Sequence, residues 1–422
     1  MSRDPANEPL PDPRVLRLIH PDLFGRERSK QFPASLLPSL LHGVGYSKVS
    51  LIEGLTGIPL EGEEFPDQKT HPDLLAVPDR ATARRPPWEP DAVWLLADLV
   101  EEGPSRLCSR TVLRDACAAL KERGLDAVAA PEPEFYLLHG DDGRLPYSMH
   151  GTSYMIGREV DPDGAFGRLH RSLMDFGVAV TCANREFTPG QFEINMHHAD
   201  ALTAADNMFL LKIAVKELAR GEGLTATFMP KPFTDGEGSG MHVHLSLWRD
   251  GVNAFASDDD GVSDLCRAFI GGIQSHARAI SAFASPTVNS YKRFVPGSLT
   301  PTTASWGDDN RFCYLRIPRE RGAATRVEVR GGDASANPYL LLAAIIQAGI
   351  DGIDNDLRPR ENPDPLPRSL RESLDALAAD DVLGKALAPE LVSVFIGLKN
   401  DEIERSERTV TDWEWDHYIR RA

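Results

Sequence analysis

Charged and polar side chains alternate with other residues along four short segments of the chain, residues 131–135, 190–196, 241–248 and 326–330. The alternating positions are Glu132 and Glu134; Gln191, Glu193 and Asn195; His242, His244 and Ser246; and Arg326, Glu328 and Arg330. Successive side chains of a β-strand point to opposite faces of a sheet. The spacing therefore predicts four strands that each present one chemically active face.

The donor types on these faces indicate a particular chemistry. Glu132, Glu134, Glu193 and His242 offer oxygen and nitrogen ligands with no thiolate among them, which favours Mg²⁺ or Mn²⁺ over structural zinc. The arginine–glutamate–arginine strand places a carboxylate between two guanidinium groups, an arrangement suited to a place where a phosphate meets a metal. Any one of these strands alone is more typical of an amphipathic strand facing solvent. Together they predict a metal and nucleotide site.

A sheet and its covering helices must position these strands. Pro131 and Pro133 flank Glu132, which predicts a bulge or a sheet edge at this point. Helix and strand signals alternate along the chain after about residue 100. We therefore expect an α+β protein, with a small N-terminal domain over residues 1–100 and a larger catalytic domain over residues 101–422.

Composition and charge exclude several classes of protein. The 422 residues include 46 Lys and Arg against 63 Asp and Glu, a net charge of −17, which disfavours binding to nucleic acid. No apolar run approaches the roughly 18 residues of a membrane-spanning helix, and the first residues lack the apolar core of a secretory signal. The five cysteines are scattered and form no C-x-x-C pair, as in a reducing compartment. We expect a cytoplasmic protein with no membrane or nucleic-acid partner.

Longer motifs extend the four segments and add others. They are EPEF at residues 132–135, REFTPGQFE at 185–193, FMPKP at 228–232, GSGMHVH at 238–244, NSYKRFVPG at 289–297, RVEVR at 326–330 and ANPYL at 336–340. In this order the motifs resemble those of the glutamine synthetase family, over roughly residues 70–422.

The resemblance implies a fold and an assembly. A β-grasp N-terminal domain would precede a catalytic domain built on a curved antiparallel sheet with surrounding helices. Such proteins form hexameric rings that often stack in pairs, so we expect a homo-oligomer, and a dodecamer in particular. Neighbouring subunits would share each active site, which would hold two to three Mg²⁺ or Mn²⁺ ions in a funnel open to ATP.

The resemblance also implies a role for each motif residue. Glu134, Glu186 and Glu193 would hold the metal beside the acid substrate, and Glu132, His242 and Glu328 the metal beside the ATP phosphates. Arg311, Arg316 and Arg326 would face phosphates, His244 and Ser246 would line the nucleotide site, and Arg293, Arg330 and Gly238 would bind the amino-acid substrate. The expected catalytic residues are Arg293, Arg311 and Arg316. ATP would convert a carboxylate into an acyl phosphate, and an amine would then attack it to form an amide.

Three features depart from glutamine synthetase itself. Leu299 stands where those enzymes carry a flap glutamate that binds ammonium and takes its proton, and an apolar side chain could instead pack against an alkyl group. The aspartate loop of the N-terminal domain has no clear counterpart in residues 57–64. Glu237 stands where an asparagine usually helps to seat glutamate, although its carboxylate could pair with an α-ammonium group.

These departures favour a ligase that joins L-glutamate to an organic amine, and residues 305–311 are similar to the branch of the family that uses such amines. One alternative is a glutamine synthetase with an atypical ammonium site, completed by Glu61, Glu63 or Glu64 of a neighbouring subunit. Another alternative is a catalytically inactive family member with a regulatory or structural role. The complete set of metal ligands and arginines speaks against inactivity, and the sequence does not name the amine.

Overall fold

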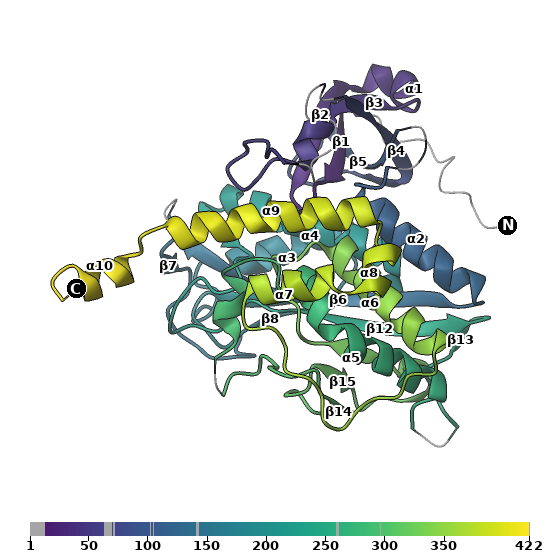
Figure 1. Ribbon diagram of the computed structural model, residues 1–422. Helices are drawn as coiled ribbons and strands as arrows, with labels where there is room; N and C mark the ends of the chain where they lie inside the picture. The colour runs from purple at the N-terminus through teal and green to yellow at the C-terminus, as the bar shows by residue number, and fades with distance from the viewer. Residues whose placement is uncertain are drawn as a thin grey trace.

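The computed structural model describes residues 13–62, 70, 72–101, 103, 105–140, 143–258, 261–295 and 297–421. Within these residues the chain forms two β-sheets with helices around the larger one (Figure 1). The N-terminal sheet has the strand order β2-β1-β5-β4-β3. Its strands are β1 (Val15–Pro21), β2 (Glu27–Pro33), β3 (Val44–Ser47), β4 (Asp73–Arg84) and β5 (Ala92–Val100). Only β1 and β5 pair in parallel among these described strands.

The larger sheet is curved and mainly antiparallel, and it follows the order β14-β15-β16-β12-β6-β9-β8. Its main strands are β6 (Asp126–His139), β8 (Val180–Arg185), β9 (Gln191–Met196), β12 (Met241–Arg249), β14 (Trp306–Asp308), β15 (Leu315–Ile317) and β16 (Val327–Val329). Short strands β7 (Leu145–Pro146), β10 (Ala199–Asp200), β11 (Leu224–Thr227) and β13 (Val252–Asn253) pair at its margins. The α+β class predicted from the sequence is confirmed, with a sheet domain at the N-terminus and a large catalytic domain after it.

Strand β6 runs unbroken through the two prolines, which the sequence assigned to a bulge or an edge. Pro131 and Pro133 keep a regular register with β12, opposite Val243 and Met241. Alternate N–H groups of a strand point to opposite sides, and Glu134 donates its own N–H to the β12 side, at Gly240 O. The prolines therefore face the other side, where β10 ends its pairing at Ala129 and β9 begins at Glu134. The bulge is therefore absent, and the alternative of an edge fits locally, because the missing N–H groups fall in this gap where β6 has no described strand partner on that side.

The helices cover the larger sheet and carry much of the apolar core. They are α2 (Ser109–Glu122), α3 (Ala165–Asp175), α4 (Ala201–Gly221), α5 (Asp264–Ala284), α6 (Pro338–Asp354), α7 (Leu370–Ala378), α8 (Asp381–Ala386) and α9 (Pro389–Arg408). A last helix, α10 (Asp412–Tyr418), buries none of its residues. Helices α5 and α6 approach so closely that a Cβ atom at Gly272 or Gly352 would overlap the backbone of the other helix. Helix α6 begins as the Asn337–Pro338 pair predicts, with Asn337 Oδ1 accepting the N–H of Tyr339.

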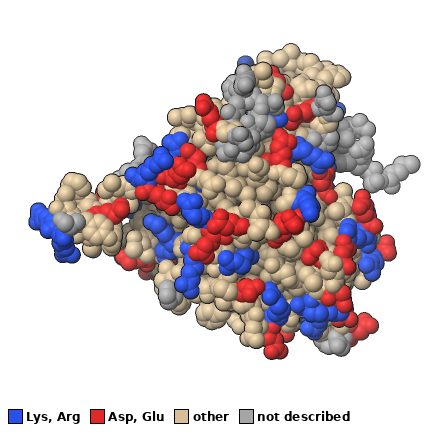
Figure 2. Space-filling model, viewed as in Figure 1, with Lys and Arg blue, Asp and Glu red and all other residues tan. Residues whose placement is uncertain are grey.

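Helix α9 runs beneath the N-terminal sheet, and α10 projects from the body of the molecule (Figure 1). The N-terminal sheet ends at Val100 and α2 starts at Ser109, so the domain boundary that we place at residue 100 remains a prediction for this connection. Acidic and basic side chains are interspersed over the face seen in Figure 2. No helix in the described part of the chain is long and apolar enough to cross a membrane.

Candidate active site

Strand β6 contributes glutamates to two different ladders of the larger sheet. The cross-strand pairs are Glu132 with His242 and Glu134 with Glu193, and β12 in turn sets His244 opposite Glu328 of β16. One face of the sheet therefore collects carboxylates and imidazoles from segments up to about 200 residues apart in the chain.

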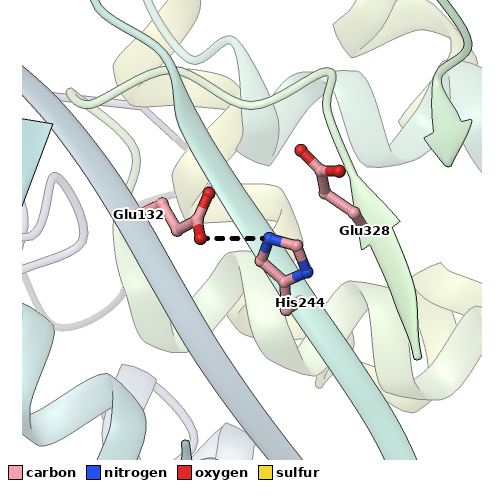
Figure 3. A group of neighbouring side chains, drawn as sticks. All are labelled: Glu132, His244 and Glu328. Atoms are coloured by element: carbon pink, nitrogen blue, oxygen red, sulfur yellow. Dashed lines mark ion pairs between the residues drawn. The ribbon is translucent and has the colours of Figure 1, made fainter. Parts of the chain in front are cut away.

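Glu132, His244 and Glu328 form a compact group that we call the histidine cluster (Figure 3). One potential ligand atom from each residue lies within 4.8 Å of the others. Glu132 Oε1 is 3.2 Å from His244 Nε2. In Figure 3 the imidazole lies between the two carboxylates, and each side chain comes from a different strand. Two carboxylates beside an imidazole are a donor set that a hard divalent cation accepts.

The hydrogen bonds of His244 argue that it is not itself the metal ligand. Arg326 Nε donates to His244 Nδ1 at 3.0 Å, so the imidazole proton must be on Nε2, which then donates to Glu132. Both ring nitrogens are thereby engaged. His242 Nδ1 lies 3.7 Å from Glu328 Oε1, and burial together with Arg330 lowers the pKa of His242 to about 3. His242 is thus neutral at pH 7, the state in which an imidazole binds a metal.

The two carboxylates of the histidine cluster stay ionised at any physiological pH. Burial opposes ionisation of Glu132, but the hydrogen bond from His244 and the electrostatic effect of the two neighbouring imidazoles lower its pKa to about 2. Burial likewise opposes ionisation of Glu328, and the neighbouring histidines, Arg330 and Arg316 lower its pKa to about 2. Both groups therefore offer permanent negative charge to a cation.

Glu134, Glu186 and Glu193 form a second group that we call the carboxylate cluster. Burial and the charge of Glu186 raise the pKa of Glu134 to about 7, and burial with Glu134 and Glu186 raises that of Glu193 to about 9. Gln191 Nε2 donates to Glu134 at 3.0 Å and Asn184 Nδ2 to Glu186 at 2.7 Å, which fixes both carboxylates in place. Like charges held together in this way fit a divalent cation, which would offset their repulsion.

Arginine side chains close the other side of the site. Both oxygens of Glu328 accept from arginines, Oε2 from Arg316 Nη1 at 2.6 Å and Oε1 from Arg330 Nη1. Arg316 also pairs with the exposed Asp309 at 2.6 Å. The side chain of Arg311 is exposed, and its carbonyl accepts from Arg330 Nε at 3.0 Å. These guanidinium groups make a positively charged wall that suits phosphate oxygens.

Arg293 is buried and is held mainly by backbone carbonyl groups. Its guanidinium donates to Gly331 O at 2.9 Å and Gly332 O at 3.1 Å, and only 4% of the residue is exposed. Gly238 packs against it, since a Cβ atom at this position would lie 2.7 Å from Arg293 Cγ. A glycine is therefore required here for close packing, whatever contact it makes with a substrate.

Two adjoining cavities contain every residue that the sequence assigned to the site. The larger, about 560 Å³, is lined by both clusters, by the arginines, and by Gly238, Glu237 and Leu299. The smaller, about 440 Å³, has a more apolar wall that includes Ser246, whose Oγ accepts from Trp248 Nε1 at 3.0 Å. The two cavities share Glu132, His244 and Arg326. This geometry provides a charged chamber with a less polar chamber beside it.

Several residues of the site were not assigned from the sequence. Asn184 and Gln191 orient the carboxylate cluster, and Asp309 pairs with Arg316. Alternation had placed Gln191 on the face of Glu193, but nothing in the sequence indicated which carboxylate it would contact. Tyr154 and Phe187 also line the larger cavity and are largely exposed.

Comparisons with known proteins agree with this geometry. The family described as the glutamine synthetase catalytic domain matches residues 106–418. The glutamine synthetase of Thermus thermophilus is 36% identical over 439 residues, covering 96% of each chain. That of Clostridium saccharobutylicum is 35% identical over 433 residues, covering 96% of this chain and 95% of its own. A solved structure described as a GmaS/ADP complex has 30% identity and a TM-score of 0.87, with 97% of each chain covered.

The fold, the site and these matches define an ATP-dependent ligase. The chain belongs to the glutamine synthetase family, and the resemblance found in its motifs is thereby confirmed.

Proposed function

We propose that the protein activates the γ-carboxylate of L-glutamate with ATP and joins it to an organic amine, forming a γ-glutamyl amide. The observation that carries the choice of amine is Leu299. Its side chain is 38% exposed and forms part of the wall of the larger cavity, beside Ser298 and Thr300. An isobutyl group can neither take a proton from ammonium nor balance its charge, whereas each buried CH₂ of an alkylamine is worth about 0.8 kcal/mol against such a wall.

In this proposal the site holds Mg²⁺ or Mn²⁺, two to three ions in all, and His242 takes the place of His244 beside the two carboxylates of the histidine cluster. Glu132, His242 and Glu328 would hold the ion on the nucleotide side, and the carboxylate cluster would hold the ion on the acid side. The ions, when bound, supply positive charge to the transferring phosphoryl group.

The side chains around the ions position the reactants. Arg311, Arg316 and Arg326 would face the ATP phosphates, with the nucleoside against His244 and Ser246 in the less polar cavity. Arg293 and Arg330 would fix the carboxylates of glutamate, and Glu237 would pair with its α-ammonium group. Because Arg293 is held by two carbonyl groups, its charge is oriented before any substrate arrives.

Glutamine synthetase activity with ammonia is the second candidate, and the names of the curated relatives favour it. An ammonium site would need an acid near Leu299. Glu61 is exposed and does not line either cavity of the single chain, and Glu63 and Glu64 lie outside the described residues. A catalytically inactive role is the third candidate, in which Mg²⁺ and ATP would bind without turnover.

We also propose a cytoplasmic homo-oligomer of hexameric rings, stacked as a dodecamer. Five free cysteines support a reducing compartment. Native mass spectrometry would give the number of 46.4 kDa chains in the assembly directly.

The decisive experiment measures ADP release with Mg²⁺, ATP and L-glutamate against ammonium, methylamine, ethanolamine, putrescine and spermidine, with mass spectrometry of the products. We expect an organic amine to exceed ammonium by at least tenfold in kcat/KM. Efficient formation of glutamine would overturn the assignment of the amine. Absence of ADP release with every amine would indicate that glutamate is not the acid substrate. Glu237 would then be the first residue to exchange.

A pair of matched variants isolates the contribution of Leu299. Leu299→Glu adds an acid that can bind ammonium, and Leu299→Gln has nearly the same shape without the charge. We expect Leu299→Glu to raise kcat/KM for ammonium relative to Leu299→Gln by about tenfold, the gain of one charge-assisted hydrogen bond. Equal activity of the two variants with ammonium would contradict the role given to this position.

A further inference from the structure

A third cavity lies apart from the active site, where the N-terminal sheet meets the catalytic domain. Its volume is about 480 Å³, and it shares no lining residue with the two active-site cavities. The turn after β1 contributes Phe24 and Arg26, helix α4 contributes Lys212 and Lys216, and helix α9 contributes Lys399. Figure 1 shows α9 running beneath the N-terminal sheet at this junction. We call this cavity the lysine pocket.

Aromatic and aliphatic side chains form most of the wall of the lysine pocket. They include Phe24, Phe228, Phe283, Leu340 and Phe395, which come from both domains. A cavity of this size with an apolar lining and a few charged groups has the composition of a small-molecule site. The ligand must therefore carry an apolar body.

The charged groups of the pocket are unbalanced. Four cations line it, Arg26, Lys212, Lys216 and Lys399, and among the described lining residues Glu402 is the one acid. Arg26 pairs with Asp22 at 2.8 Å and Lys399 with Glu402 at 3.0 Å, so the excess positive charge rests on Lys212 and Lys216. The polar end of a ligand must therefore be anionic.

Lys212 and Lys399 are buried in the pocket, with 7% and 2% of each residue exposed. Lys399 Nζ pairs with Glu402 at 3.0 Å and lies 4.2 Å from the ring centre of Phe24. Lys212 Nζ donates to the carbonyls of Ser335 and Ala336 at 3.4 and 3.2 Å, and it forms no ion pair within the described part of the chain. An ammonium group has three N–H donors, so each lysine keeps at least one for a ligand.

We propose that the lysine pocket binds a small organic carboxylate with an aromatic or alkyl body. The carboxylate would accept from Lys212 and Lys399, and the body would lie against the phenylalanine rings. An anion there supplies the counter-charge that the buried ammonium of Lys212 lacks, which no uncharged ligand of the same shape can do.

The test uses 3-phenylpropanoate as the probe, titrated into the full-length protein by calorimetry with ATP, Mg²⁺ and L-glutamate present. Binding in their presence places the probe outside the ATP and glutamate positions and does not depend on the proposed reaction. We expect 3-phenylpropanamide and inorganic phosphate each to bind at least tenfold more weakly, because the first lacks the charge and the second lacks the apolar body. Absence of binding up to 5 mM, a concentration that would largely fill a site with a Kd of about 1 mM, or equal binding of the amide, would overturn the proposal.

Two pocket variants and a surface control locate the probe. Lys212→Met and Lys399→Met remove a buried charge while keeping the apolar stem, and we expect each to weaken binding of the probe by tenfold or more. Lys121→Met removes a charge from an exposed lysine that pairs with Asp126, and it should leave binding unchanged. Thermal unfolding without the probe verifies that each variant is folded. Wild-type affinity in both pocket variants would overturn the proposal.

Proton uptake gives a second measurement that needs no variant. Burial lowers the pKa of Lys212 to about 7, with Lys216 adding to the effect and Asp333, Glu27 and Asp22 opposing it. A bound carboxylate favours the charged ammonium, so at pH 8 binding should take up a fraction of a proton. Calorimetry in two buffers of different ionisation enthalpy measures this uptake. A value of zero at pH 8 would contradict contact between the carboxylate and Lys212.

Discussion

Replacing Arg110 with methionine should destabilise the protein by about 3–5 kcal/mol. Arg110 is 1% exposed at the start of α2, and its guanidinium joins the two domains. It donates to Asp206 of α4 through two hydrogen bonds of 2.8 Å, to Asp98 of β5 at 2.9 Å, and to Asp79 of β4 at 2.8 Å. Methionine keeps the apolar volume of the stem and removes all of these donors.

The size of this destabilisation depends on which hydrogen-bond and charge partners each carboxylate keeps after Arg110 is replaced. Asp98 keeps its ion pair with Arg114 at 2.7 Å, and the side chain of Asp79 is 30% exposed and can be hydrated. Asp206 is buried and, within the described part of the chain, keeps one hydrogen bond, from the hydroxyl of Tyr339 at 2.7 Å. The cost therefore comes mainly from one uncompensated buried charge, which is worth about 3–5 kcal/mol, a large part of a typical stability of about 5–15 kcal/mol.

The same buried carboxylate, Asp206, determines how the destabilisation by Arg110→Met depends on pH. Burial already raises the pKa of Asp206, and loss of Arg110 should raise it further. The folded variant then takes up a proton at a pH where the unfolded chain, with a pKa of about 3.9, does not. Protonation of the folded state favours folding, so the deficit of Arg110→Met should shrink as the pH falls from 8 to 5.

Urea denaturation at one fixed protein concentration measures the effect, because oligomers unfold in a concentration-dependent way. Arg114→Met is the matched control on the same helix. Its side chain is 42% exposed and shares Asp98 with Arg110, so its loss should cost less than about 1 kcal/mol. Similar destabilisation by the two variants, or a deficit that grows at low pH, would refute the reasoning.

Two further predictions concern His276 and Gln191. Burial opposes the charge on His276, but hydrogen bonds to Asp380 and Asp351 raise its pKa. The stabilisation by charged His276 is complete below the pKa of histidine in the unfolded chain, about 6.5, and is lost as the pH rises through the pKa of His276 in the folded protein. In urea denaturation, His276→Gln should therefore cost more stability at pH 6 than at pH 9. Equal losses at the two pH values would contradict this. Gln191→Ala removes one of the two hydrogen bonds to Glu134, leaving that of the Gly240 N–H, and should raise the Mg²⁺ concentration for half-maximal ADP release by about 10–100-fold. An unchanged Mg²⁺ titration would count against that role.

Much of the site could be predicted from the sequence because its residues alternate along strands. The period of two placed Glu132 and Glu134 on one face, and the histidines of residues 241–248 on another, before any pairing was known. Strand pairing decides which residues become neighbours: Glu132 pairs with a residue of β12, whereas Glu134 pairs with a residue of β9. Strand register depends on contacts between distant segments, and no local pattern encodes it.

Local rules failed where tertiary structure offered an exception. Pro131 and Pro133 argued against a long central strand, yet β6 tolerates them because their nitrogens face a gap between β10 and β9. The motif also indicated that Gly238 belongs to the site, but only the structure shows that Arg293 occupies the space of its missing side chain. In both cases the deciding neighbour lies far away in the sequence.

The charge balance of the histidine cluster has a consequence for how a nucleotide can enter. Arg316 and Arg330 already engage both oxygens of Glu328. A phosphate that draws Arg316 toward itself takes a counter-charge away from a carboxylate that is 1% exposed, and a buried carboxylate left in this way is costly. A nucleotide that arrives with a divalent cation replaces that charge, whereas a free nucleotide does not. Within the proposed function, the ion pairs of Glu328 therefore select for the metal–nucleotide complex before the chemistry begins.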